Sequence, residues 1–205
     1  MDYLELSLES LHIESIHLAQ NIEISFHPDI VVYVAKGGYL IGKDIAEYFK
    51  IPYVGIYAQR EGNNAKAKLT VILKSLPRFI TKLLRLVELK SGLHKTLKER
   101  NVFWDPSDDC LEKMKDVHSV LLVDDSVDTG YSMKMLLPYV RKAASVSIDV
   151  RIAAINVWSK SESIIHTDFY NYRDTIIVTP MSNDSREHDQ FLQQYADRHG
   201  IHKEI

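Results

Sequence analysis

The sequence predicts an α/β protein whose central, mainly parallel sheet is flanked by helices. Two apolar runs, 30–35 and 120–123, indicate strands of such a sheet, because strands covered by helices on both faces are apolar throughout. A glycine-containing turn and a helical pattern follow each run. This repeated order of strand, turn and helix is typical of parallel α/β folds.

The other elements are indicated by the spacing of apolar residues and by the Pro and Gly residues between them. The expected elements are, in chain order, a leading helix over 6–24, the strand over 30–35, a helix over 40–49, a strand over 52–57, the strand over 120–123, a helix beginning near Met133, a strand over 146–157, a strand over 175–181 and a short amphipathic helix within 182–205.

Composition agrees with a compact globular protein and excludes little else. The chain has 205 residues, of which 45% are hydrophobic and 26% charged, so it can bury a substantial core as one domain. It begins without a basic and apolar leader and has no apolar run of about 18 residues, so we expect a cytoplasmic protein without a membrane span. The single cysteine, Cys110, excludes an internal disulfide.

Asp124 and Asp125 directly follow the second apolar run. At the carboxyl end of a parallel strand, adjacent carboxylates can accept hydrogen bonds from vicinal hydroxyls or face a divalent cation. Asp128 to Ser132 then form a turn in which Gly130 permits a positive φ, before the next helical pattern. Such a turn binds phosphate through backbone N–H groups and the helix dipole. Together these features describe a ribose 5-phosphate site.

The turn after the first strand, Lys36-Gly37-Gly38-Tyr39, is a second candidate for anion binding. Paired glycines let the backbone approach an anion closely, and the Lys36 cation or its neighbouring amides would hold it. Alone, such a turn occurs at protein surfaces as well as at ligand sites. Its position before a second strand-turn-helix unit favours a ligand loop.

Residues 120–132 resemble the 5-phosphoribosyl-1-pyrophosphate (PRPP) motif of type I phosphoribosyltransferases: an apolar strand, two acidic residues, a spacer, and Thr-Gly-x-Ser. The turn at 36–39 looks like the pyrophosphate loop of the hypoxanthine–guanine branch. The resemblance implies one type I phosphoribosyltransferase domain over 1–205, with a helical or loop insertion over 60–115, and a small hood and C-terminal helix over 158–205. It implies a glycosyltransferase that moves the phosphoribosyl group of PRPP to an acceptor, with a purine base expected, and releases pyrophosphate.

The resemblance also implies a role for each motif residue. Asp124 and Asp125 would bind the ribose hydroxyls, act in catalysis and hold the expected cofactor, Mg²⁺. Asp128 would accept a proton from the purine ring, and its alternative is a simple Asx-turn residue. The implied substrate-binding residues are Ala35, Lys36, Gly37, Gly38, Ser126, Val127, Thr129, Gly130, Tyr131, Ser132, Trp158, Lys160 and Met181.

The residues around the acceptor base stay open. In purine-specific members a lysine just past the strand after the central motif commonly binds the exocyclic oxygen, and either Lys160 or Trp158 stands at that place. Met181 ends a strand that resembles the hood strand, where bacterial xanthine–guanine relatives have a tryptophan. Phe169, Tyr170 or Trp158 would then supply stacking.

Residues 60–100 carry eleven Lys or Arg against three Glu, in a chain whose formal net charge is −3. We expect a helix there between Pro77 and Gly92. Three explanations of the basic residues along this helix stay open: the helix packs on the sheet and they are solvated, they lie at a subunit interface, or they form a surface for a polyanion or anionic lipid. Nucleic acid is not favoured, because no aromatic residues are interleaved to stack bases. Candidates for a lid that excludes water are Arg60, Glu61, Asn63 and Asn64.

Three functions are compatible with these features. The leading one is transfer to a purine base, with PRPP and the base as small-molecule substrates and a homodimer as the assembly. The second is a regulator of the same fold that binds PRPP or a nucleotide without turnover. The third is an enzyme that uses PRPP with an unusual, non-purine acceptor. An intact donor motif is expected in all three.

Overall fold

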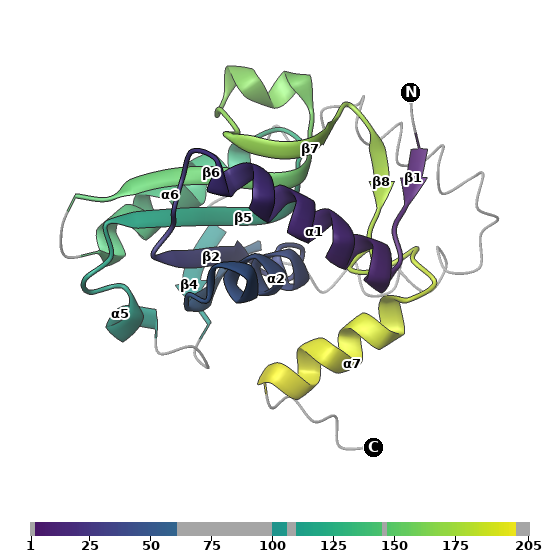
Figure 1. The fold of residues 1–205 in the computed structure, drawn as a ribbon, viewed down its shortest axis with the longest axis horizontal. Coiled ribbons are helices and arrows are strands. Elements are labelled where there is room, and N and C mark those ends of the chain that lie inside the picture. The colour runs from purple at the N-terminus through teal and green to yellow at the C-terminus, as the bar shows by residue number, and fades with distance from the viewer. Residues whose placement is uncertain (1–2, 61–99, 106–109, 145–146, 200–205) are drawn as a thin grey trace. The chain divides into compact units, whose positions relative to one another are not determined.

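Strands and helices alternate along most of the chain (Figure 1). The computed structural model describes residues 3–60, 100–105, 110–144 and 147–199. Residues 1–58 and 102–205 form one compact unit, and 59–101 form another. The described elements are β1 (Tyr3–Glu5), α1 (Leu8–Glu23), β2 (Ile30–Val34), α2 (Tyr39–Phe49), β3 (Tyr53–Arg60), β4 (Arg100–Trp104), α5 (Cys110–Lys113), β5 (Ser119–Val127), α6 (Tyr131–Ala143), β6 (Asp149–Val157), a 3₁₀ helix (Ser159–Ser163), β7 (Phe169–Arg173), β8 (Ile176–Val178) and α7 (His188–His199).

Six strands form the central sheet in the order β4-β3-β2-β5-β6-β7. Neighbouring strands from β3 to β7 are parallel, which confirms the predicted fold class. From β2 the chain moves outward to β3 on one side, and β5 later pairs with β2 on its other side. The strand order therefore reverses between β2 and β5. Open α/β sheets bind ligands outside the carboxyl ends of their strands at such a point.

The strands of the sheet contribute alternate side chains to two apolar cores. Val31, Tyr33 and Leu121 pack with α1 and α2 on one face, whereas Val32 and Leu122 pack with α6 on the other. Figure 1 shows α1 and α2 together in front of the sheet. Because both faces are covered, the middle strands need apolar residues at every position, and this requirement explains the two apolar runs of the sequence.

The predicted helices and strands shift at their ends for local reasons. The helix predicted over 6–24 begins at Leu8, because Ser7 caps it: Ser7 Oγ accepts a hydrogen bond from the Ser10 N–H, and Ser10 Oγ accepts one from the Ser7 N–H. The strand predicted over 146–157 begins at Asp149. The helix expected near Met133 begins at Tyr131, with Gly130 at its N-cap in the left-handed conformation, φ 79°.

Strand β5 is longer than the predicted strand at 120–123. Its pairing with β2 ends at Val123, which lies opposite Tyr33, but its pairing with β6 continues to Val127, opposite Val157. The prediction of a strand end at Val123 was wrong because the ladder with β6 extends the strand. Asp124 and Asp125 therefore lie on β5 itself, past the end of β2.

Strands β4 and β7 were not predicted. Both lie at edges of the central sheet and have one strand neighbour each, so neither needs a continuous apolar sequence. β4 falls within the range expected to be an insertion, and β7 falls within the range assigned to the hood. The separate parallel pair of β1 and β8 contains the expected hood strand. The domain boundaries within 1–205 stay a prediction.

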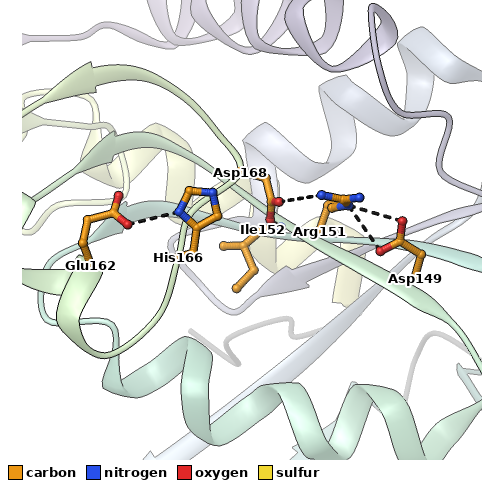
Figure 2. A network of polar contacts seen from close by, with 6 residues as sticks. All are labelled: Asp149, Arg151, Ile152, Glu162, His166 and Asp168. Carbon is orange, nitrogen blue, oxygen red and sulfur yellow. Dashed lines mark hydrogen bonds and ion pairs between the residues drawn. The ribbon is translucent and has the colours of Figure 1, made fainter.

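Asp168 holds β7 in register beside β6 (Figure 2). Its carboxylate accepts the N–H of Ile152 at 2.8 Å and pairs with Arg151 at 3.1 Å, while its own N–H donates to the Ile152 carbonyl at 2.9 Å. Arg151 also pairs with Asp149 at 3.2 Å. Ala153 then lies opposite Phe169, at the first residue of β7.

Several predictions fall outside the described residues. These include the helix expected between Pro77 and Gly92, most of the basic stretch 60–100, and the lid candidates Glu61, Asn63 and Asn64. Among the described helices, none has the length and hydropathy that a membrane crossing requires.

Candidate active site

The two motif turns meet at the point where the strand order reverses. The turn 35–38, which includes a cis peptide bond between Ala35 and Lys36, follows β2 and lies against the acidic pair of β5. A Cβ atom on Gly37 would lie 2.7 Å from Oδ1 of Asp124 and 2.7 Å from Oδ1 of Asp125. The expected pyrophosphate loop and the expected ribose-binding carboxylates are therefore direct neighbours.

Gly38 brings this turn close to the backbone of β5. A Cβ atom there would collide with the carbonyl oxygen of Val123. The N–H of Gly38 donates to the Val34 carbonyl at 2.7 Å, and the N–H of Ala35 donates to the Ile56 carbonyl at 3.0 Å. The paired glycines are thus required for close approach between the turn and strand β5.

The two carboxylates of the acidic pair interact strongly. Burial and the neighbouring charge of Asp125 raise the pKa of Asp124 well above its ordinary value. The Asp125 N–H donates to Asp124 Oδ1 at 2.9 Å, and the Thr179 hydroxyl donates to Asp125 Oδ2 at 3.3 Å. Thr179 follows β8 directly, so the hood side of the chain contacts the acidic pair.

The expected phosphate turn, 128–132, connects β5 to α6. Gly130 adopts a positive φ of 79°, and an added Cβ would lie 2.7 Å from the Ile165 side chain. In the part of the chain that the structure describes, no side chain caps the N-terminus of α6. Gly130, the N-cap, has no side chain to do so, and the N-terminus of a helix favours an anion through its backbone N–H groups and its dipole. Thr129, Tyr131 and Ser132 are half-buried around the turn.

Asp128 is held by a neighbour on β5. Its Oδ1 accepts the Ser126 hydroxyl at 2.7 Å, and Ser126 Oγ in turn accepts the side-chain amide of Asn156 at 3.4 Å. Ser126 and Asn156 lie opposite each other in the ladder of β5 and β6. Val127 is buried in the core beside α6, so its side chain packs in the core and does not face the turn.

The residues expected near the base lie around the end of β6 and after β8. Trp158 is buried, and its backbone N–H donates to the Val127 carbonyl at 3.1 Å. Lys160 is exposed, with Nζ 5.4 Å from the centroid of the Trp158 ring. Met181 is half-buried against the core of α1 and α2. The Phe169 ring stacks on Phe26, with centroids 6.3 Å apart, so it belongs to the core.

Three tyrosines, Tyr195 of α7 with Tyr39 and Tyr57, lie beside the turn 35–38, the expected pyrophosphate loop. Tyr195 is buried, and its ring packs edge-on against Tyr39 at 5.1 Å, while Nζ of Lys36 lies 5.5 Å from its centroid. The Tyr195 hydroxyl contacts the hydroxyl of Tyr57, which donates to buried Asp105 at 2.7 Å. Burial and these hydrogen bonds raise the pKa of Tyr57, so its hydroxyl stays protonated.

Sequence reasoning missed three residues that contact the site. Asn156 could have been recognised from the sequence, since it is the one polar residue in the apolar run 152–157. Thr179 and Tyr195 could not, because their contacts with Asp125 and Lys36 join residues far apart in the sequence.

Comparisons with known proteins agree with this geometry. A family model described as phosphoribosyl transferase domain matches residues 7–189. A purine phosphoribosyltransferase from Pyrococcus horikoshii Ot3 has a similar structure, with 18% identity and a TM-score of 0.56 over 88% of this chain and 93% of that one. A xanthine-guanine-hypoxanthine phosphoribosyltransferase from Helicobacter pylori shows 14% identity and a TM-score of 0.54 over 94% and 97%.

A third similar structure is a hypothetical protein from Neisseria gonorrhoeae with bound ppGpp, at 15% identity and a TM-score of 0.56 over 94% of each chain. At these identities the likeness concerns the fold. No curated protein matches the chain. The family model, by contrast, spans nearly the whole sequence and includes both motif turns and the acidic pair. The predicted family and enzyme class are thereby confirmed, and this chain belongs to the phosphoribosyltransferases, a family of glycosyltransferase enzymes.

Proposed function

We propose that this protein transfers the 5-phosphoribosyl group of PRPP to a purine base and releases pyrophosphate. The observation that carries the proposal is the position of Gly37 directly over the carboxylates of Asp124 and Asp125. An uncapped helix start follows the same strand. This arrangement supports a single site that binds a pyrophosphate, a ribose diol and a 5-phosphate.

The acidic pair fits the ribose hydroxyls and a divalent cation. Two adjacent carboxylates beside the turn suit Mg²⁺, which usually takes one or two protein carboxylates and completes its shell with substrate oxygens and water. The described residues contain no group of three or more His, Cys, Asp or Glu side chains that could hold a metal ion. When bound with PRPP, Mg²⁺ supplies positive charge that neutralises the departing pyrophosphate. Asp124 and Asp125 orient the ribose and stabilise positive charge at its anomeric carbon.

Asp128 acts as the proton acceptor for the purine ring nitrogen. It is half-buried, lies at the start of the phosphate turn and has an ordered hydrogen bond from Ser126. Lys160 is exposed beside Trp158, where its ammonium can donate to an exocyclic oxygen of the base. Two structurally similar proteins are named for purine-type acceptors, which supports this choice of base.

The test is pyrophosphate release from PRPP and Mg²⁺ across hypoxanthine, guanine, xanthine, adenine, uracil and orotate, with PRPP binding followed by calorimetry. We expect release that depends on a 6-oxopurine. Release with orotate or uracil alone would contradict the purine assignment while keeping the enzyme class. PRPP binding without release on any base would favour an unusual acceptor or a regulator.

A nucleotide-binding regulator is the second candidate, and one observation favours it. The similar protein from Neisseria gonorrhoeae was solved with ppGpp. Calorimetry with ppGpp in the same series decides this point: tight binding together with absent turnover would replace the enzyme proposal. The expected homodimer stays a prediction.

A further inference from the structure

Asn156 is a buried amide in the middle of an apolar strand. It is 1% exposed, and its neighbours on β6, Ile155 and Val157, are fully buried. Burial of an amide is costly unless its donor and acceptor both find partners. Asn156 meets this condition with two partners from different segments: Thr175, just before β8, and Ser126 on β5.

The hydrogen-bond partners determine how the Asn156 amide is oriented. The backbone N–H of Thr175 can only donate, so the Asn156 atom 3.4 Å away is the carbonyl oxygen Oδ1. The amino group Nδ2 therefore faces Ser126 Oγ, also at 3.4 Å, and donates to it. The buried amide is thus held in one orientation by the backbone of another segment.

The orientation of Asn156 in turn directs the hydroxyl proton of Ser126. A serine hydroxyl has one proton, and Ser126 Oγ already accepts a hydrogen bond from Asn156. Its proton then points to Oδ1 of Asp128, at 2.7 Å, which is a short hydrogen bond to a carboxylate. A directed chain results, from Thr175 through Asn156 and Ser126 to Asp128.

We propose that Asn156 is a positioning residue for the acceptor base: it acts through Ser126 to hold Asp128 in the orientation that proton transfer requires. This inference rests on the proposed function, in which Asp128 accepts the proton. Asn156 itself touches no substrate. Because Thr175 immediately precedes β8, this chain of hydrogen bonds also couples the orientation of Asp128 to the position of β8.

A double-mutant cycle tests whether Asn156 acts through Ser126. We expect Ser126→Ala and Asn156→Ala each to lower kcat about tenfold, with the KM for PRPP little changed, because each removes the directed hydrogen bond to Asp128. The double variant should be no slower than the slower single variant, since both substitutions interrupt the same chain of hydrogen bonds. A double variant about a hundredfold slower than wild type, the product of independent effects, would overturn the proposal.

Two further variants separate positioning from general damage. Ser126→Thr keeps the hydroxyl and suits a strand, so it should restore most of the kcat lost in Ser126→Ala. Asn171→Ala is the matched control, because this half-buried asparagine of β7 donates to Glu14 at 2.7 Å away from the site. It should lower the melting temperature but not kcat. An equal loss of kcat in Asn171→Ala would assign the Asn156 effect to stability.

Crystal structures of wild type and Asn156→Ala give a readout that does not need turnover. We expect Asp128 in the variant to lie out of hydrogen-bonding distance of Ser126 Oγ or to occupy two positions. An Asp128 carboxylate that stays in place overturns the inference whatever the kinetics show. A displaced Asp128 in a protein that releases no pyrophosphate with any base keeps the positioning role and rejects the proposed function.

Discussion

Gly37 contributes to the site through the side chain that it lacks. Its α-carbon lies so close to the acidic pair that one methyl group would meet both Oδ1 atoms at 2.7 Å. These atoms are the ends of side chains and can move, whereas the Val123 carbonyl that faces Gly38 belongs to the backbone of β5. The two adjacent glycines therefore have different tasks: Gly37 lets the turn approach the two carboxylates, and Gly38 lets the turn pack on the backbone of the sheet.

This difference predicts opposite effects of two neighbouring substitutions. Gly37→Ala should push the carboxylates aside, weaken PRPP and Mg²⁺ binding about tenfold or more, and change the melting temperature little. Gly38→Ala should mainly destabilise the fold, by about 1–3 kcal/mol, as overpacking does. Calorimetric titration and thermal unfolding measure the two effects. If Gly37→Ala binds PRPP like wild type, the acidic pair is not the donor site.

Asp128 is the second residue whose role can be isolated. Asn has nearly the same shape but cannot take up a proton, so Asp128→Asn should lower kcat about 10²-fold or more and leave PRPP affinity largely intact. Pre-steady-state pyrophosphate release, combined with calorimetry, separates these quantities. A variant that keeps its rate would reduce Asp128 to a turn residue held by Ser126.

At the scale of elements, α7 matters because it brings the C-terminal part of the chain to the motif turns. Phe191 and Tyr195 are its buried residues, and both belong to the core of α1 and α2. The Tyr195 ring also faces the ammonium group of Lys36, with Nζ 5.5 Å from the ring centroid. The helix thus packs as part of the core while contacting the expected pyrophosphate turn.

The docking of α7 predicts a clear contrast between two positions of one helix. Phe191→Ala removes a fully buried ring and should cost about 3–5 kcal/mol of unfolding free energy. Gln194→Ala, at an exposed position of the same helix, should change it by less than about 0.5 kcal/mol. Urea unfolding of both variants tests this prediction. Equal, small effects would mean that α7 is not docked on the core in solution.

Asp29 joins the starts of β2 and β5 and predicts a pH dependence. Burial alone would raise the pKa of Asp29, but hydrogen bonds from the N–H groups of His118 and Ser119, at 2.8 and 2.9 Å, lower it below its ordinary value. The stabilisation is therefore complete above the unfolded-state pKa of about 3.9 and is lost as pH falls through the lower folded-state pKa. Wild type should exceed Asp29→Asn in stability at neutral pH and lose that advantage in acid. Urea unfolding across this range measures it, and a constant difference would reject the role of the charge.

At the scale of the whole molecule, the site combines segments that are distant in the sequence. The turn after β2, the acidic end of β5, the start of α6, the end of β6 and Thr179 after β8 all contribute to it. A ligand bound there favours the folded chain over the unfolded one by mass action. Ligand binding should consequently stabilise the entire unit rather than one loop.

PRPP with Mg²⁺ at about 100 times its Kd should stabilise the protein by about 2.7 kcal/mol, a rise in melting temperature of several degrees. The double variant Asp124→Asn/Asp125→Asn should lose this rise, because it changes both of the proposed ribose contacts and both of the proposed metal ligands. Asp149→Asn, an exposed aspartate at the start of β6, is the control and should keep it. Differential scanning calorimetry decides the point. A full rise in the double variant would place the donor elsewhere.

Local sequence patterns were sufficient for the middle of the fold and for the donor motifs. The apolar runs at 30–34 and 120–123 must be buried on both faces, and a strand followed by a glycine turn and a helix forms within a short stretch of chain. Chemistry that depends on neighbouring residues, such as Asp124 beside Asp125 or Gly130 before α6, could therefore be predicted before the structure. The edge strands β4 and β7 could not, because an edge strand needs no distinctive pattern.

The sequence by itself determined the α/β class, the two glycine turns after β2 and β5, and the family, since each depends on residues close together in the chain. Only the tertiary structure decided that Gly37 lies over the acidic pair, that Asn156 directs Ser126 toward Asp128, and that Thr179 reaches Asp125. These contacts form where parallel strands place their carboxyl ends side by side. The spacing of residues along the chain does not predict which strand ends become neighbours, because strand order and pairing register arise from packing of the whole sheet.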